Sequence, residues 1–101
     1  MHILVRTDLP LADQCVQACH AGIRAGMRFA PPDDCPLVLL GVPDRATLED
    51  YALRAAHAGI ARVIFDEPDD GMGHTALCTE PLTREAGRLF RRLPLWSGRC
   101  L

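Results

Sequence analysis

Lysine is absent from this chain of 101 residues, and all 11 basic residues are arginines. The absence excludes every side-chain amine as a nucleophile or as a clamp for phosphate groups. The formal net charge of -2 and the pI near 6.0 also exclude the broad cationic field that holds nucleic acid non-specifically. Any contact with RNA must therefore come from a local patch of arginines.

The five cysteines lack C-x-x-C spacing and are odd in number: Cys15, Cys19, Cys35, Cys78 and Cys100. We therefore expect free thiols in a reducing cytosol rather than a disulfide framework. A zinc site on Cys15, Cys19 and His20 is disfavoured, because His20 points about 100° away from Cys19 on a helix and no fourth ligand is suggested. The sequence predicts no metal.

No apolar run approaches the roughly 20 residues that span a bilayer, and no signal-peptide pattern precedes Arg6 and Asp8. We therefore expect a cytoplasmic protein that does not associate with membranes. With 49% hydrophobic and 24% charged residues and no repeat, the sequence predicts one domain over residues 1–101. A core of this size gives modest stability, so a homodimer that hides further apolar surface is a reasonable expectation.

Apolar periodicity predicts strands at 2–6, 37–42, 60–65 and 74–79 and helices at 11–28, 44–57 and 83–93. Asp44 and Thr83 are suited to cap the second and third helices, and Gly59 to follow the second with φ > 0. The last two strands flank the acidic, glycine-rich stretch 66–73, which predicts an antiparallel hairpin. The order predicts an α/β fold of three α/β/α layers around a four-stranded mixed, mainly parallel sheet.

Helical and strand periodicity also predicts which side chains share a face. On the first helix we expect an inner face of small residues (Leu11, Cys15, Ala18, Cys19, Gly22, Gly26) and an outer polar stripe (Asp13, Gln17, His20, Arg24). On the fourth strand, His74, Ala76 and Cys78 are expected on one side. The outer stripe of the last helix, Arg84, Arg88 and Arg91, is open to two interpretations, a contact with tRNA phosphates or a solvated face.

Several short motifs occur in a characteristic order: Val5-Arg6-Thr7-Asp8-Leu9, Gln17-Ala18-Cys19-His20-Ala21, Ala58-Gly59-Ile60, Phe65-x-Glu67-Pro68-Asp69, Thr75-Ala76-Leu77-x-Thr79-Glu80-Pro81 and Arg92-Leu93-Pro94-Leu95. In this order and spacing the chain resembles the type 2 peptidyl-tRNA hydrolases over almost its whole length. It is most similar to the bacterial branch of that family that lacks the lysine-glycine-rich signature.

The resemblance implies a homodimeric α/β/α enzyme that needs no metal or organic cofactor. It would hydrolyse the ester between a peptide, or an N-blocked amino acid, and tRNA. Its implied catalytic residues here are His20, Asp66 and Thr75. We assign substrate binding to Gln17, Arg6, Asp8, Arg24 and His74.

Asp13 stands where typical members of the resembled family have the catalytic lysine, four residues before Gln17. An acid there repels an incoming phosphate unless Arg6 or Arg24 compensates, although it also suits the first turn of a helix. A non-catalytic binding module of the same fold, for tRNA or a protein partner, is therefore the rival hypothesis. His20 as a solvated histidine and Asp66 as a turn residue are the simpler alternatives, and an enzyme for other small esters is a third class.

Overall fold

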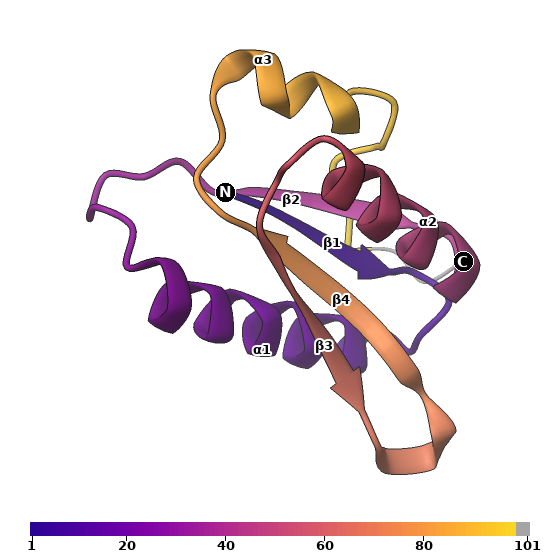
Figure 1. Ribbon diagram of the computed structural model, residues 1–101. Helices are drawn as coiled ribbons and strands as arrows, with labels where there is room; N and C mark the ends of the chain where they lie inside the picture. The colour runs from indigo at the N-terminus through magenta and orange to yellow at the C-terminus, as the bar shows by residue number, and fades with distance from the viewer. Residues whose placement is uncertain (99–101) are drawn as a thin grey trace.

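The computed structural model describes residues 1–98 and contains one four-stranded sheet (Figure 1). Its strands are β1 (His2–Arg6), β2 (Val38–Val42), β3 (Arg62–Glu67) and β4 (Gly73–Thr79). The helices are α1 (Leu11–Phe29), α2 (Arg45–His57) and α3 (Arg84–Gly87), with short 3-10 turns η1 (Asp69–Gly71) and η2 (Arg88–Phe90). The predicted α/β class and the four-stranded mixed sheet are confirmed.

The strand order is β2-β1-β4-β3. β1 pairs in parallel with β2, whereas β4 pairs antiparallel with both β1 and β3. The predicted hairpin of the last two strands therefore forms and places β4 inside the sheet. One of the three strand pairings is parallel, although β1, β2 and β3 all run in the same direction.

Helices lie on both faces of the sheet (Figure 1). Ala18, Ala21 and Ala25 of α1 pack with alternate strand residues such as Val5 and Ala76. On the other face, Leu4 and Leu77 pack with α2 and with Phe90 of η2. The alternation follows from the two-residue period of a strand, which directs Leu4 and Val5 to opposite faces.

The predicted inner face of α1 holds for Ala18, which is buried, and for the partly buried Gly22 and Gly26, but is wrong for its other three members. Leu11, Cys15 and Cys19 are exposed, whereas Gln14 and Gln17 are buried together with the alanines one and two turns further on. The glutamines can lie inside because their amides are hydrogen-bonded there, which removes most of the cost of burying them. Gln14 Nε2 donates to the Leu9 carbonyl over 2.7 Å, and Gln14 Oε1 accepts from Trp96 Nε1 over 2.8 Å.

The predicted common side for His74, Ala76 and Cys78 holds for Ala76 and Cys78, which both pack on the α1 side, but is wrong for His74. Phe65 pairs with Ala76 but Asp66 pairs with His74, so β4 has an extra residue, Thr75, at a β-bulge. The bulge interrupts the alternation, with Thr75 and Ala76 both directed toward α1. His74 turns toward α2 instead.

Helix ends agree with the predictions for α2 and differ for the last helix. Asp44 accepts a hydrogen bond from the Thr47 amide over 2.8 Å, and Gly59 has φ 75°. Thr83 caps α3 as predicted, but the helical stretch continues only through η2 and ends before residue 93. Gly87 in its middle explains the early loss of α-helical geometry, because glycine disfavours helix interiors by about 1 kcal/mol. Within residues 1–98 no helix is long and apolar enough to cross a membrane.

Candidate functional site

A chain of hydrogen bonds joins α1 to the start of β4 and the end of β3. Thr75, which is fully buried, donates its hydroxyl proton to Gln17 Oε1 over 2.6 Å. Gln17 Nε2 in turn donates to Glu67 Oε2 over 3.2 Å. Because Gln17 is only 3% exposed and is held at both ends, its amide has one orientation.

His20 and Arg24 lie on the same aromatic ring, one turn apart on α1. The His20 imidazole is parallel to Phe65, with centroids 4.5 Å apart and planes at 6°, and Arg24 Cζ is 5.2 Å from the same centroid. Phe65 and Glu67 point toward α1, since they are two residues apart on β3. The exposed imidazole of His20 therefore borders the Gln17–Glu67 pair.

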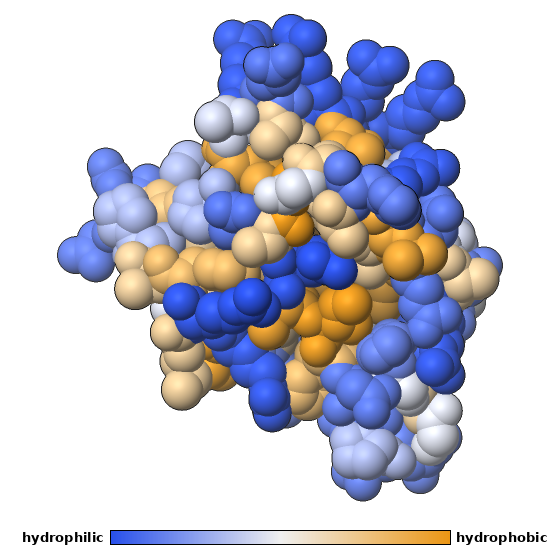
Figure 2. Space-filling model, in the orientation of Figure 1, coloured by the Kyte–Doolittle hydropathy of each residue, from blue (hydrophilic) through white to orange (hydrophobic). Residues whose placement is uncertain are grey.

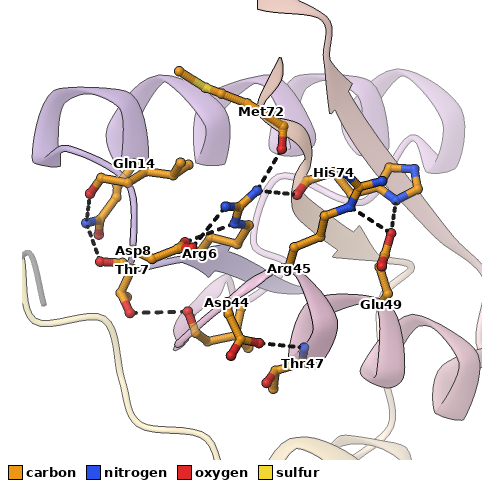
Figure 3. Close-up of polar contacts among 12 residues, drawn as sticks. Arg6, Thr7, Asp8, Gln14, Asp44, Arg45, Thr47, Glu49, Met72 and His74 are labelled. Atoms are coloured by element: carbon orange, nitrogen blue, oxygen red, sulfur yellow. Dashed lines mark hydrogen bonds and ion pairs between the residues drawn. The ribbon is translucent and has the colours of Figure 1, made fainter. Parts of the chain in front are cut away.

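Arg6 ties the end of β1 to the hairpin (Figure 3). Its guanidinium holds Asp8 in a bidentate ion pair, with both N–O distances at 2.9 Å. The remaining nitrogen donates to the carbonyls of Met72 and His74 over 2.7 and 3.2 Å. Four of the five N–H donors of this guanidinium are therefore bonded within the protein, so Arg6 orients the hairpin.

His74 belongs to a second polar group on the α2 side (Figure 3). Its Nδ1 lies 2.7 Å from Glu49 Oε2, and Arg45 Nε donates to the same oxygen over 3.1 Å. Gly73, at φ 68°, leaves the space that the Arg45 guanidinium occupies. The sheet therefore separates His74 from Thr75, although they are neighbours in sequence.

Asp66 and Asp13, the two acids discussed in the sequence analysis, lie apart from these contacts. Asp66 is exposed on the edge strand β3 and makes no side-chain hydrogen bond or ion pair within residues 1–98. Asp13 is partly exposed in the first turn of α1, one turn before Gln17. The structure thus brings together Gln17 with Thr75, and His20 with Arg24, but gives Asp66 no hydrogen bond to His20.

Electrostatics keep two carboxylates ionised. The pKa of Glu67 is lowered first by the hydrogen bond from Gln17, then by the Asp69 amide, with the electrostatic influence of the nearby His20 as a smaller cause. The pKa of Glu49 is lowered by its hydrogen bonds with His74 and Arg45. Burial, by contrast, raises the pKa of the Cys78 thiol to about 11, so Cys78 is not a thiolate nucleophile at neutral pH.

Glu67 and Glu49 were missed as site residues from the sequence. Glu67 had a usable signal, because it stands two residues after the apolar Phe65 and so shares its face of the strand. Glu49 had a weaker one, its spacing of four residues from Arg45 on a helix. The contact of Glu49 with His74 depends on the β-bulge, which no local sequence pattern predicts.

The α1 side thus presents the exposed imidazole of His20 beside the carboxylate of Glu67, whereas the Gln17 amide and the Thr75 hydroxyl that adjoin this carboxylate are buried. A base beside hydrogen-bond donors and acceptors can activate a water molecule for attack on a carbonyl. Within residues 1–98 no group of three or more histidines, cysteines and acids is placed to hold a metal ion. No protein-family model and no curated protein matches the chain.

Proposed function

We propose that this protein is a peptidyl-tRNA hydrolase-like esterase that cleaves the ester between a peptide, or an N-blocked amino acid, and tRNA. The observation that carries the proposal is the 2.6 Å hydrogen bond between Thr75 and Gln17, two residues assigned to the site from separate motifs. The proposal includes the three-layer, mainly parallel family fold, a cytoplasmic role in translation and no required cofactor. Helices on both faces and three strands of common direction support the fold.

In this proposal His20 takes a proton from a water that attacks the ester carbonyl, and the proton then passes to the 3′ oxygen of the tRNA as the C–O bond breaks. The sequence assigns Gln17 and Thr75 to hold the water or the carbonyl; because both are buried, they act in this proposal through Glu67, whose carboxylate Gln17 binds. The sequence assigns Asp66 a part in proton transfer; because it alternates with Phe65 and Glu67 on β3 and so points away from α1, Glu67, whose carboxylate Gln17 binds directly, takes that part in this proposal. The surroundings in which the substrate binds are shaped by four further residues, Arg24, Asp8, Arg6 and His74.

The homodimer is part of the same proposal. An apolar hollow of about 660 Å³ lies beside α1, with Cys19, Gly22 and Ile23 on one side and Leu37 and Leu39 on the other. Large apolar side chains are exposed around it or nearby on the chain, namely Val16 (49%), Ile23 (61%), Met27 (81%) and Leu37 (63%). Continuous apolar surface of this kind is typical of interfaces. Ile23→Arg should convert a dimer to monomer in analytical ultracentrifugation, whereas exposed Leu53→Arg on α2 should not.

The direct test is release of N-acetyl-amino acid from N-acetyl-aminoacyl-tRNA by purified protein. We expect turnover that falls at least about a hundredfold in His20→Ala, the usual scale for loss of a general base. His57→Ala, at the exposed end of α2, is the matched control and should keep the full rate. Folded wild-type protein that releases no amino acid would overturn the proposal.

A non-catalytic binding module is the second candidate, and Asp13 is the observation that favours it. An acid one turn from Gln17 places negative charge where a lysine would assist the ester. This candidate predicts salt-sensitive binding of tRNA, or binding of a protein partner, with no ester cleavage. Cleavage of simple acyl esters without preference for tRNA would instead indicate an enzyme for other small esters, the third hypothesis from the sequence.

A further inference from the structure

The arginine face of the last helical segment is the most concentrated positive surface in the described chain. Residues 84–92 contain four arginines and one glutamate, although the whole chain carries a net charge of -2. Arg84, Arg88 and Arg91 are all exposed. Figure 2 shows hydrophilic side chains projecting at the end of the molecule where Figure 1 places α3.

The geometry of the segment aligns these three side chains. α3 runs directly into η2, and Gly87, Arg88 and Arg91 all have right-handed helical dihedrals. Residues four apart on an α-helix are neighbours, and residues three apart in a 3-10 turn lie one above the other. The arginines therefore form a line of about 10 Å.

The line borders a hollow of about 350 Å³ whose floor includes His2 and Gly87. His2 stacks on the buried Phe90, with centroids 5.4 Å apart, and Phe90 anchors the segment in the core. Gly87 leaves the hollow open, since a β-carbon there would stand 3.5 Å from His2 Cε1. The arginines are therefore mounted on a fixed part of the fold.

The guanidinium groups of these arginines make no hydrogen bond or ion pair within residues 1–98. Arg6, Arg45 and Arg54, by contrast, are each paired with a carboxylate. Like charges at helical spacing repel one another, so the unpaired line disfavours the folded segment slightly until an anion neutralises it. Guanidinium groups bind phosphate oxygens through paired N–H donors, which makes phosphate the matching anion.

We propose that Arg84, Arg88 and Arg91 bind successive phosphates of an RNA backbone, in a region of the tRNA remote from the ester. This inference rests on the proposed function for the identity of the RNA. A line of about 10 Å is long enough to follow successive phosphates of one strand, whereas a single phosphate needs only one or two of the arginines. Because His2 lies beside Thr79, the line is at the opposite end of β4 from Thr75, about 13 Å away along the strand.

The experiment measures binding of deacylated tRNA by fluorescence anisotropy across a range of salt concentrations. We expect the triple variant Arg84→Gln/Arg88→Gln/Arg91→Gln to bind about tenfold or more weakly, with a salt slope reduced by about 2. Arg88→Gln alone should lower the slope by about 0.7 to 0.9, whereas the matched Arg54→Gln should leave it unchanged. In the ester assay the triple variant should raise KM and leave kcat near the wild-type value.

Unchanged tRNA affinity and salt slope in the triple variant, with native thermal unfolding, would overturn this inference even if the protein hydrolyses the ester. Binding of tRNA that weakens in the triple variant, by a protein that does not hydrolyse the ester, would support this inference although the proposed function failed. Binding to vesicles of anionic lipid that weakens in the triple variant, with no binding to tRNA, would also overturn this inference. Such a result would assign the three arginines to a membrane surface.

Discussion

The hydroxyl of Thr75 and the amide oxygen of Gln17 are 2.6 Å apart, although 58 residues separate them in the sequence. Both side chains are buried, and each satisfies a polar group that would otherwise be left without water. The pair therefore fixes α1 against β4 at the point where the site forms. Mutation can separate the contribution of this pair to stability from its effect on the neighbouring Glu67.

Removing both members of this pair should destabilise the fold by less than the sum of the two single losses. Thr75→Val leaves Gln17 Oε1 buried without its donor, a loss of about 1–3 kcal/mol in the free energy of unfolding. In Thr75→Val/Gln17→Leu neither partner remains, so the two losses should fail to add by about 1 kcal/mol or more. Urea denaturation of the four proteins gives this coupling. Strict additivity would show that the hydrogen bond contributes nothing.

The carboxylate of Glu67 should titrate at a lower pH in wild-type protein than in Gln17→Leu. The amide hydrogen bond is the largest cause of its lowered pKa, so its removal returns the pKa toward the ordinary value of 4.5. NMR titration of the Glu67 side-chain carbon measures the difference. Gln14→Leu, which removes a different buried amide of α1, is the control and should leave the Glu67 midpoint in place. Equal midpoints in all three proteins would contradict the contact.

Much of the fold could be predicted from local pattern because each element obeys a local rule. The caps at Asp44 and Thr83 and the positive φ of Gly59 each depend on a few neighbouring residues. The hairpin of β3 and β4 followed from two apolar runs around an acidic, glycine-rich stretch. These features need no knowledge of the tertiary structure.

The errors arose where distant contacts override local pattern. Gln14 looked like a surface residue, yet Trp96, 82 residues away, and nearby carbonyls satisfy its amide in the core. The bulge at Thr75 depends on how two strands pair, so the side to which His74 points could not be read from alternation alone. The catalytic assignments of His20 and Asp66 remain predictions.

His2 should make the protein less stable in mildly acidic solution. Burial lowers its pKa below 6.5, so folding favours the neutral ring. The stability from this preference is fully present above pH 6.5 and is lost as the pH falls through the lowered folded-state pKa. His2→Phe keeps a ring on Phe90 and should flatten the free energy of unfolding across that window. His57→Gln, an exposed site, should retain the wild-type pH dependence; equal curves for wild type and His2→Phe would refute the argument.

Trp96 is the only tryptophan and should report on the packing of the final segment. Its indole donates to Gln14 Oε1 over 2.8 Å, so Trp96→Phe keeps an aromatic ring but leaves that oxygen unsatisfied. We expect a loss of about 1–3 kcal/mol in chemical denaturation. Wild-type fluorescence should shift to the red at the same denaturant concentration at which circular dichroism is lost. A separate, earlier fluorescence change would show that the segment detaches before the fold opens.

Asp13→Lys tests the charge at the mouth of the site. The residue lies one helical turn from Gln17, close enough for its charge to act on a bound ester or on an approaching phosphate. Reversing the charge should raise kcat/KM for N-acetyl-aminoacyl-tRNA by at least about tenfold, because attraction replaces repulsion along the approach. Asp13→Asn should give an intermediate value, and the gain should shrink in high salt as the charges are screened. Asp50→Lys on α2 makes the same charge change away from the site and separates local from overall electrostatics. An Asp13→Lys rate no higher than that of Asp50→Lys would show that Asp13 does not face the reacting ester, and the catalytic lysine of the resembled family would then have no counterpart at this position.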